Sequence, residues 1–182
     1  DENYGGIAGT DAFYILLASV ELAKCASGGL AASLLSHTIG TPPIQHFAQE
    51  ELKAEVLPQI LSGEKISALA ITEPSGGSDV AALKTKAVRD GDNYIVSGEK
   101  TFITSGIRAD YYTVAVRTDP NAKGANGISM LLIDAHSAGI TKSKLDKMGW
   151  WASDTAHLHF DNVRVPARNL LGAENMGFFV IM

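Results

Sequence analysis

The apolar residues between Thr10 and Gly63 recur three and four positions apart, which is the spacing of an α-helix with one buried face. A threonine followed by proline, at Thr41 and Pro42, is typical of a helix start. The pattern predicts four short helices packed as an antiparallel helical subdomain. The apolar repeats stand at Phe13, Leu16, Leu17 and Val20, at Leu30, Leu34 and Leu35, and at Leu52, Val56 and Ile60.

After Gly63 the pattern changes to short runs rich in β-branched and aromatic residues that are bounded by turns. Alternation of polar and apolar residues from Thr155 to Phe160 indicates a half-buried strand. The sequence Arg89–Asn93 is typical of a hairpin turn. The predicted strands are Ile66–Thr72, Leu83–Arg89, Tyr94–Thr104, Tyr111–Thr118, Gly127–Asp134 and Thr155–Val163.

We therefore predict an α+β chain, in which a helical segment is followed by an antiparallel β-barrel or sandwich domain. We expect the helical segment at residues 1–63 and the β domain at residues 64–171. Residues 172–182 resemble the first turns of a further helix that ends at Met182, so we expect a C-terminal helical bundle to be missing from this sequence.

Composition narrows the function classes. The 182 residues hold 15 Lys and Arg against 20 Asp and Glu, and a net charge of −5 disfavours binding to nucleic acid. No apolar run is long enough for a membrane span. The single cysteine, Cys25, excludes an internal disulfide and is expected to be buried on a helix. His157 and His159 share a strand face but have no third ligand nearby, so we predict no metal site.

The segment Leu69–Asp79 runs from a predicted strand into a glycine turn. Gly76 and Gly77 allow backbone amides to converge on a ligand, and such a turn can receive a pyrophosphate with Ser78 as an added donor. The alternative is a plain connection between strands, which the spacing alone favours.

A second segment, Gly98–Gly106, places an aromatic ring and a hydroxyl two residues apart, at Phe102 and Thr104. Residues two apart share a face of a strand, so this pair can offer a packing surface and a donor to a flat heteroaromatic ring. The alternative is a core phenylalanine beside a threonine with its own partner.

Taken in order, these segments resemble the acyl-CoA dehydrogenase family. That family pairs a Thr-Glu-Pro-x-x-Gly-Ser-Asp turn with a downstream Gly-x-Lys-x-(Trp/Phe)-Ile-Thr strand. The resemblance spans the whole chain and includes the segments Tyr4–Gly6, Met148–Thr155, Phe160–Pro166 and Leu171–Phe178.

The resemblance implies a bound FAD. Leu69, Ile71 and Thr72 would meet the flavin ring, with Thr72 at its pyrimidine edge, while Gly77 and Ser78 would approach the pyrophosphate. On the opposite flavin face the resemblance implies Phe102, Ile103 and Thr104, with Thr104 near N5. Many relatives carry Trp where this chain has Phe102, and the smaller ring affects flavin tuning rather than flavin binding.

The same resemblance implies α,β-dehydrogenation of a fatty acyl-CoA to a trans-2-enoyl-CoA, as in fatty acid β-oxidation. Electrons would pass to an electron-transferring flavoprotein. The base would be a Glu beyond Met182, so we expect no catalytic base among these residues and assign that role to none of Glu73, Glu99 and Glu174. The residues printed here are then expected to be inactive alone.

The helix from Leu30 to Ile39 would line the acyl pocket by this resemblance. We expect Ser78, Ala31, Ala32 and Leu35 to meet the substrate, and the closing motifs favour a medium to long or branched acyl chain. The lysines Lys142, Lys144 and Lys147 either meet the phosphates of CoA or form a solvated face.

The resemblance also implies a homotetramer or homodimer for the full-length protein. The compartment would be cytoplasmic in a bacterium and the mitochondrial matrix in a eukaryote. The open alternatives are an acyl-CoA oxidase that uses oxygen, and an inactive relative that only binds acyl-CoA.

Overall fold

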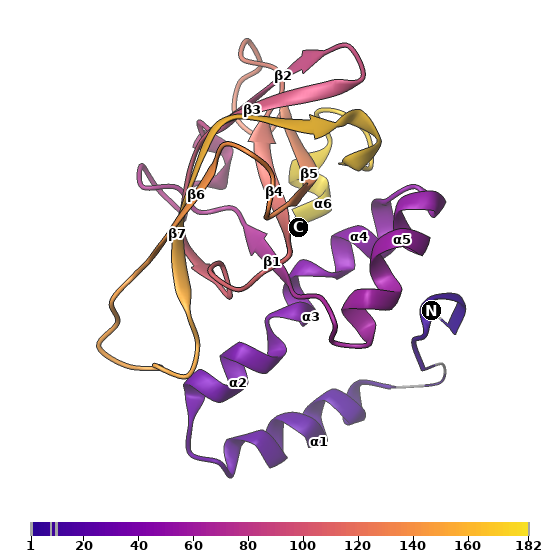
Figure 1. Cartoon of the computed structure of the whole chain (residues 1–182), viewed down its shortest axis with the longest axis vertical. Coiled ribbons are helices and arrows are strands. Elements are labelled where there is room, and N and C mark those ends of the chain that lie inside the picture. The colour runs from indigo at the N-terminus through magenta and orange to yellow at the C-terminus, as the bar shows by residue number, and fades with distance from the viewer. Residues whose placement is uncertain (1, 8, 10, 182) are drawn as a thin grey trace.

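The computed structural model describes residues 2–7, 9 and 11–181. Thr10 and Met182, where we expected the helical pattern to begin and the last helix to end, lie outside the described residues. In the described chain, helices precede and follow a single sheet, which confirms the α+β class (Figure 1). The α-helices are α1 (Ala12–Ala23), α2 (Gly28–Leu35), α3 (His37–Gly40), α4 (Pro42–Phe47), α5 (Glu50–Leu61) and α6 (Gly177–Ile181).

Short polar side chains cap the first two helices. The carboxylate of Asp11 accepts from the backbone N–H of Phe13 at 2.8 Å, and the Ser27 hydroxyl accepts from the N–H of Leu30 at 3.4 Å. Pro42 occupies the first position of α4, as the sequence predicts. Helix α5 buries Leu52, Val56, Leu57 and Ile60 along one face, which confirms the predicted helical stripe.

The strands form one eight-stranded sheet in the described chain, in the order β6-β7-β3-β2-β4-β5-β8 with β1 beside β4. The β3–β7, β4–β5 and β6–β7 pairs are antiparallel, as predicted, but β1 is parallel to β4, so the sheet is mixed, and it does not close into a barrel. The β2–β3 hairpin lies between β1 and β4 in the sequence. Its two strands run in opposite directions, and β4 then runs in the same direction as β1. The strands are β1 (Ser67–Ala70), β2 (Lys86–Asp90), β3 (Asn93–Thr104), β4 (Tyr111–Arg117), β5 (Ile128–Asp134), β6 (Ile140–Lys144), β7 (Thr155–Pro166) and β8 (Leu170–Leu171).

Of the described strands with more than two residues, β6 is the one that the sequence pattern misses. It pairs only with β7 and therefore forms an edge of the sheet. Its sequence, Ile-Thr-Lys-Ser-Lys, buries no residue fully, so it lacks the apolar alternation by which a strand is recognised. Lysines on an edge strand also discourage pairing with another chain.

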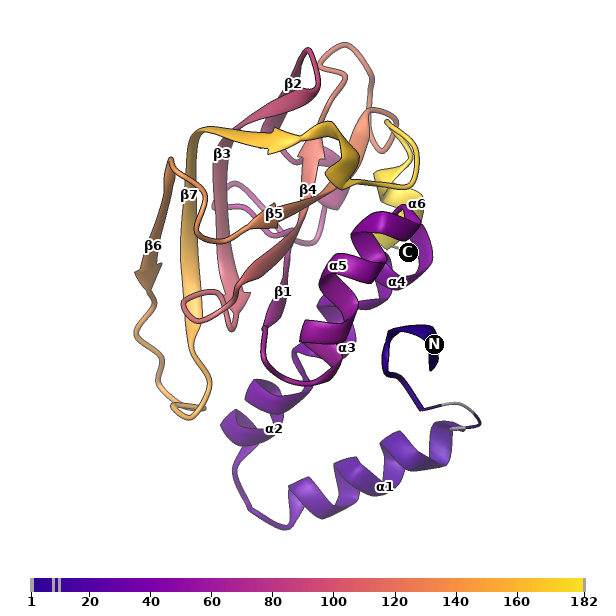
Figure 2. The same cartoon turned by 45° about the vertical axis from the view of Figure 1, so that its right-hand side comes forward.

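The core lies on both faces of the sheet, and strand β5 separates its two parts. Leu131 and Ile133 face a cluster enclosed by the curved sheet, which includes Tyr112 and Phe160. Met130 and Leu132 of β5 face a second cluster, formed with α4, α5 and α6. Figure 2 shows these helices lying together against one side of the sheet. The alternate burial follows from the two-residue period of a strand.

Helix α1 forms where the apolar period predicts it, yet none of its described residues is buried. Phe13, Leu16, Leu17 and Val20 are between 48% and 69% exposed. Both views show α1 apart from the sheet, at the far end of the helical segment (Figures 1 and 2). Cys25 follows α1 and is exposed, so the expectation of a buried cysteine is wrong.

Candidate functional site

The glycine turn predicted from the sequence follows β1 and is held by two backbone hydrogen bonds. Glu73 N–H donates to Gly76 O at 3.1 Å, and Gly76 N–H donates to Glu73 O at 3.0 Å. A Cβ at Gly77 would lie 2.9 Å from Cγ2 of Thr72. Gly77 therefore lets the side chain of Thr72, at the end of the β1 segment, pack directly against the glycine turn.

A buried ion pair joins this turn to β3. The side chains of Lys100 and Glu73 are 0% and 4% exposed, and Lys100 Nζ lies 2.9 Å from Glu73 Oε1. Lys100 Nζ also donates to Ile71 O at 2.9 Å, while Thr101 N–H donates to Thr72 O at 2.9 Å. Two neighbouring residues of β3 thus hold the carbonyls of Ile71 and Thr72, which fixes the end of β1 relative to β3.

Backbone donors also reach both oxygens of the Glu73 carboxylate. It accepts from the N–H groups of Lys84 and Thr85 at 2.6 Å and 2.8 Å. Burial acts to raise the pKa of Glu73, but the charge of Lys100 and the hydrogen bonds from Thr85 outweigh it, and the pKa lies below its usual value. Burial lowers the pKa of Lys100 to about 8, against the pull of Glu73.

A bulge near the end of β3 turns Phe102 outward. The pairing of β3 with β7 shifts register between Lys100 and Ile103, and Phe102 adopts a φ of +59°. Phe102 is consequently 69% exposed, whereas Ile103 is 2% exposed and belongs to the core inside the sheet. Phe102 and Thr104 both line one cavity, whereas Ile103 is not among the residues that line it.

This cavity has a volume of about 400 Å³ and lies between the helical segment and the sheet. It brings together five residues that were named one by one from the sequence and four that were not, although three of these four lie in the Leu30–Ile39 segment expected to line the acyl pocket. The first group is Leu69, Phe102, Thr104, Ala32 and Leu35; the second is Ser36, Thr38, Ile39 and Trp150. Ser36 and Ile39 continue the helical spacing of Ala32 and Leu35, so that spacing could have identified them. Nothing in the sequence pattern places Trp150 beside α2.

The other predicted site residues lie next to this cavity or apart from it. Ile71, Thr72, Gly77 and Ser78 continue from β1 into the glycine turn, and they do not line the cavity. Ala31 lies on α2 and is half-buried outside the lining.

Three hydroxyls of the predicted site are available to a ligand. Within the part of the chain that the structure describes, no hydrogen bond is made by the side chains of Thr72, Ser78 and Thr104. The nearby hydroxyls of Thr85 and Ser36 do have protein partners. An exposed aromatic ring, an apolar cavity and three free hydroxyls fit the flat ring and polar tail of a flavin nucleotide.

No carboxylate lines the cavity among the described residues. Glu73 is committed to Lys100, and Glu99 lies 3.3 Å from His159. Glu174 is exposed near the start of α6. None of the three is therefore placed to remove a proton from a ligand in this cavity.

Two of the three candidate lysines are engaged inside the chain. Lys147 Nζ donates to the carbonyls of Trp150 and Ser153, and Lys142 Nζ donates to those of Ile107 and Ala109. Within residues 2–7, 9 and 11–181, no three His, Cys, Asp or Glu side chains gather as metal ligands. No helix in those same ranges has the length and apolar character to cross a bilayer.

Comparison with known proteins supplies the family. Residues 68–163 match the model of the acyl-CoA dehydrogenase middle domain, and residues 1–64 match that of the acyl-CoA dehydrogenase N-terminal domain. Over 181 residues the chain is 41% identical to cyclohexane-1-carbonyl-CoA dehydrogenase of Geobacter metallireducens, covering 98% of this chain and 47% of that protein.

Solved structures give the same result. An acyl-CoA dehydrogenase from Geobacillus kaustophilus is 47% identical with a TM-score of 0.94, over 100% of this chain and 48% of that one. A chain from a structure described as the electron transferring flavoprotein of Acidaminococcus fermentans is 40% identical with a TM-score of 0.93, over 99% of this chain and 47% of that one. The chain spans about half the length of the curated relatives it matches. On the matched domains and the shared architecture, this chain belongs to the acyl-CoA dehydrogenase family.

Proposed function

We propose that these residues hold the flavin and part of the acyl chain in an enzyme that oxidises a fatty acyl-CoA to a trans-2-enoyl-CoA. The observation that carries the proposal is the cavity shared by Phe102, Thr104 and Leu69 from the sheet with Ala32 and Leu35 from α2. It joins a surface suited to a flat ring with a surface suited to an alkyl chain. Family membership supports the same reading.

In this proposal the cofactor is FAD. Leu69, Ile71 and Thr72 would meet one part of its ring, and Phe102, Thr104 and the backbone of Ile103 another, while Gly77 and Ser78 would approach the pyrophosphate. When bound, FAD would accept the electrons that the acyl chain loses. The Lys100–Glu73 pair would hold the two ring-binding segments at a fixed separation.

The chain's own residues would bind and orient the acyl group and keep water away from it. Ala32 and Leu35 would contact the alkyl chain, and we keep Ala31 and Ser78 as further substrate contacts in this proposal. Because no carboxylate lines the cavity in the described chain, we propose that the base is a Glu beyond Met182.

The rest of the proposal concerns the whole protein. The acyl chain would be of medium to long or branched type, the electron acceptor an electron-transferring flavoprotein, and the assembly a homotetramer or homodimer. We propose residues 1–63, 64–171 and 172–182 as parts of three successive domains. The compartment would be the cytoplasm in a bacterium or the mitochondrial matrix in a eukaryote.

Anaerobic spectroscopy tests this function. The full-length protein should purify with a yellow flavin, and adding an acyl-CoA should bleach its visible absorbance as the flavin is reduced. Reoxidation should need an electron-transferring flavoprotein; fast reoxidation by air alone would identify an oxidase instead. A yellow protein that no acyl-CoA bleaches would contradict the proposed reaction, and a protein that binds no flavin would contradict the proposed cofactor.

A further inference from the structure

The turn between β6 and β7 carries Trp150 onto the first residues of α2. A Cβ at Gly28 would lie 2.6 Å from Nε1 of Trp150, and one at Gly29 would lie 2.8 Å from the backbone carbon of Trp150. Both distances are too short for a real Cβ. Because these two glycines carry no side chain, Trp150 can pack directly against the start of α2.

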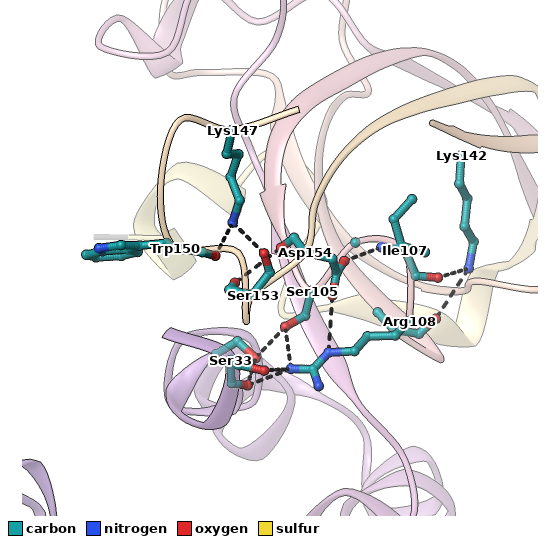
Figure 3. Close-up of polar contacts among 12 residues, drawn as sticks. Ser33, Ser105, Ile107, Arg108, Lys142, Lys147, Trp150, Ser153 and Asp154 are labelled. Atoms are coloured by element: carbon teal, nitrogen blue, oxygen red, sulfur yellow. Dashed lines mark hydrogen bonds and ion pairs between the residues drawn. The ribbon is translucent and has the colours of Figure 1, made fainter. Parts of the chain in front are cut away.

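The backbone of this turn is fixed in a conformation that tryptophan seldom adopts. Trp150 has a φ of +57°, which is unfavourable for a bulky side chain. Its carbonyl accepts from Lys147 Nζ and from the Ser153 N–H, both at 3.0 Å. Lys147 thus closes the turn around Trp150 from inside, which is visible in Figure 3. A strained tryptophan that is held this firmly suggests a role for its position.

A second set of contacts joins the same two elements from the side of the sheet. Arg108 Nη2 donates to the carbonyl of Ser33 at 2.8 Å and also to the Ser33 hydroxyl. Nε of the same guanidinium lies 3.2 Å from Oδ1 of Asp154, the residue that ends the turn. Figure 3 shows Arg108 lying between the helix that carries Ser33 and the loop that carries Asp154.

The Arg108 contacts are reinforced around both partners. Asp154 Oδ2 accepts from the Ile107 N–H at 2.7 Å, and the hydroxyls of Ser36 and Ser105 lie 2.9 Å apart. Ser33, Ser36 and Ser105 are all buried. Helix α2 and the Trp150 turn are therefore held at a set distance from each other.

Trp150 also lines the cavity described above, together with Ala32 and Leu35 of α2. We propose that Trp150 is a specificity-determining residue, whose indole packs against Gly28 while its backbone packs against Gly29, and that the indole limits the length of the acyl chain that the cavity accepts. Arg108 and Lys147 are positioning residues that hold the indole there. This inference rests on the proposed function, because it takes the cavity as the acyl site.

The test compares substrate preference rather than activity alone. In the flavin-loaded full-length enzyme, kcat/KM is measured for butanoyl-CoA and hexadecanoyl-CoA. Trp150→Ala should raise the ratio of long-chain to short-chain kcat/KM by at least about tenfold, since a single methylene group in an apolar pocket changes kcat/KM by about that much. Trp150→Phe, which keeps a smaller ring, should give a ratio between those of the wild type and Trp150→Ala. Met148→Ala, a fully exposed residue of the same turn, is the control and should leave the ratio unchanged.

A double-mutant cycle tests the contact between Gly28 and the Trp150 indole. Gly28→Ala places a methyl group against the indole and should change the ratio in the wild-type background. In the Trp150→Ala background the same methyl group meets no indole, so it should have no further effect. Equal effects of Gly28→Ala in the two backgrounds would show that Gly28 does not position the indole.

Arg108 is tested by the split between binding and turnover. Arg108→Met should lower KM for hexadecanoyl-CoA relative to that for butanoyl-CoA and leave kcat nearly constant, because it frees the indole that limits chain length and does not touch the reacting atoms. Arg108→Lys, which keeps a charge opposite Asp154, should restore part of the preference. Equal loss of kcat for both substrates would reject this positioning role.

The outcomes separate the inference from the function on which it rests. If the wild-type flavin is bleached by acyl-CoA but Trp150→Ala keeps the wild-type ratio, the role of Trp150 is overturned and the proposed function stands. If no acyl-CoA bleaches the wild-type flavin, the proposed function fails and the role of Trp150 fails with it.

Discussion

The Glu73–Lys100 pair and helix α1 have opposite relations between polarity and burial. The pair is charged and lies at 4% and 0% exposure, whereas α1 carries large apolar side chains of which none is buried in the described chain. Partners account for the pair: every charged atom of it has a hydrogen-bonding neighbour within the fold. Burial in this molecule therefore follows the partners available to a side chain more closely than its polarity.

Glu73→Gln should have the largest effect on stability. It leaves the Lys100 ammonium buried without its counter-charge, and breaking a buried pair on one side costs about 3–5 kcal/mol. The measurement is the free energy of unfolding in urea. Lys24→Met, which removes the exposed pair with Glu21, is the control and should cause no measurable change. A Glu73→Gln protein as stable as the wild type would show that the pair does not hold the turn.

Leu57→Ala on α5 should have the second-largest effect on the free energy of unfolding. Leu57 is 2% exposed and packs in the cluster between the helices and the sheet, so its truncation should cost about 2–5 kcal/mol. Urea unfolding measures this too. A cost well below 1 kcal/mol would mean that α5 is held to the sheet by something other than its apolar face.

Acid should weaken the contact that the Glu73–Lys100 pair makes between the glycine turn and β3. Because the pKa of Glu73 in the fold lies below its ordinary value of 4.5, the carboxylate contributes stability above pH 4.5 that is lost as the pH falls through the lower, folded value. Unfolding free energies measured from about pH 6 down to about pH 3 should fall more steeply for the wild type than for Glu73→Gln. Parallel curves for the two proteins would contradict this assignment.

Thr104→Val should affect the ligand and not the fold. The Thr104 hydroxyl has no hydrogen-bond partner in the described residues, so unfolding without flavin should be unchanged. Loss of one hydrogen bond to the flavin should weaken its binding about fivefold, measured by fluorescence titration of the apoprotein. Thr85→Val is the matched control, because Thr85 donates to Glu99 O at 3.1 Å and its loss should lower stability instead.

Leu17→Ala on α1 should have the smallest effect. Leu17 is 62% exposed, and α1 has the same length as α5, so Leu17 and Leu57 form a matched pair on two helices. In the residues printed here, Leu17→Ala should change the unfolding free energy by no more than about 0.5 kcal/mol. A cost close to that of Leu57→Ala would show that α1 is packed in solution.

The sequence predicts the elements of this fold better than their surroundings. The period at Leu52, Val56 and Ile60 identifies both α5 and its buried face, because a single stripe packs on a single surface. The same period at Phe13 and Leu16 identifies α1 but cannot say what that helix packs against. The edge strand β6 escapes because polar residues pair through their backbone as well as apolar ones do.

The candidate site follows the same division. Spacing placed Phe102 and Thr104 on one face, and both do line one cavity. The reason is a bulge rather than a regular strand, and Ile103 consequently turns into the core. Trp150 could not be assigned to the cavity from the sequence, because its position depends on packing against Gly28 and Gly29 and on the Arg108 contacts.

A crystal structure of the protein with its flavin tests the central claim most directly. The proposal predicts that the isoalloxazine ring contacts Thr72 on one side of the site and Phe102 and Thr104 on the other, with the pyrophosphate near Gly77 and Ser78. A ring bound elsewhere, out of reach of both threonines, would contradict it.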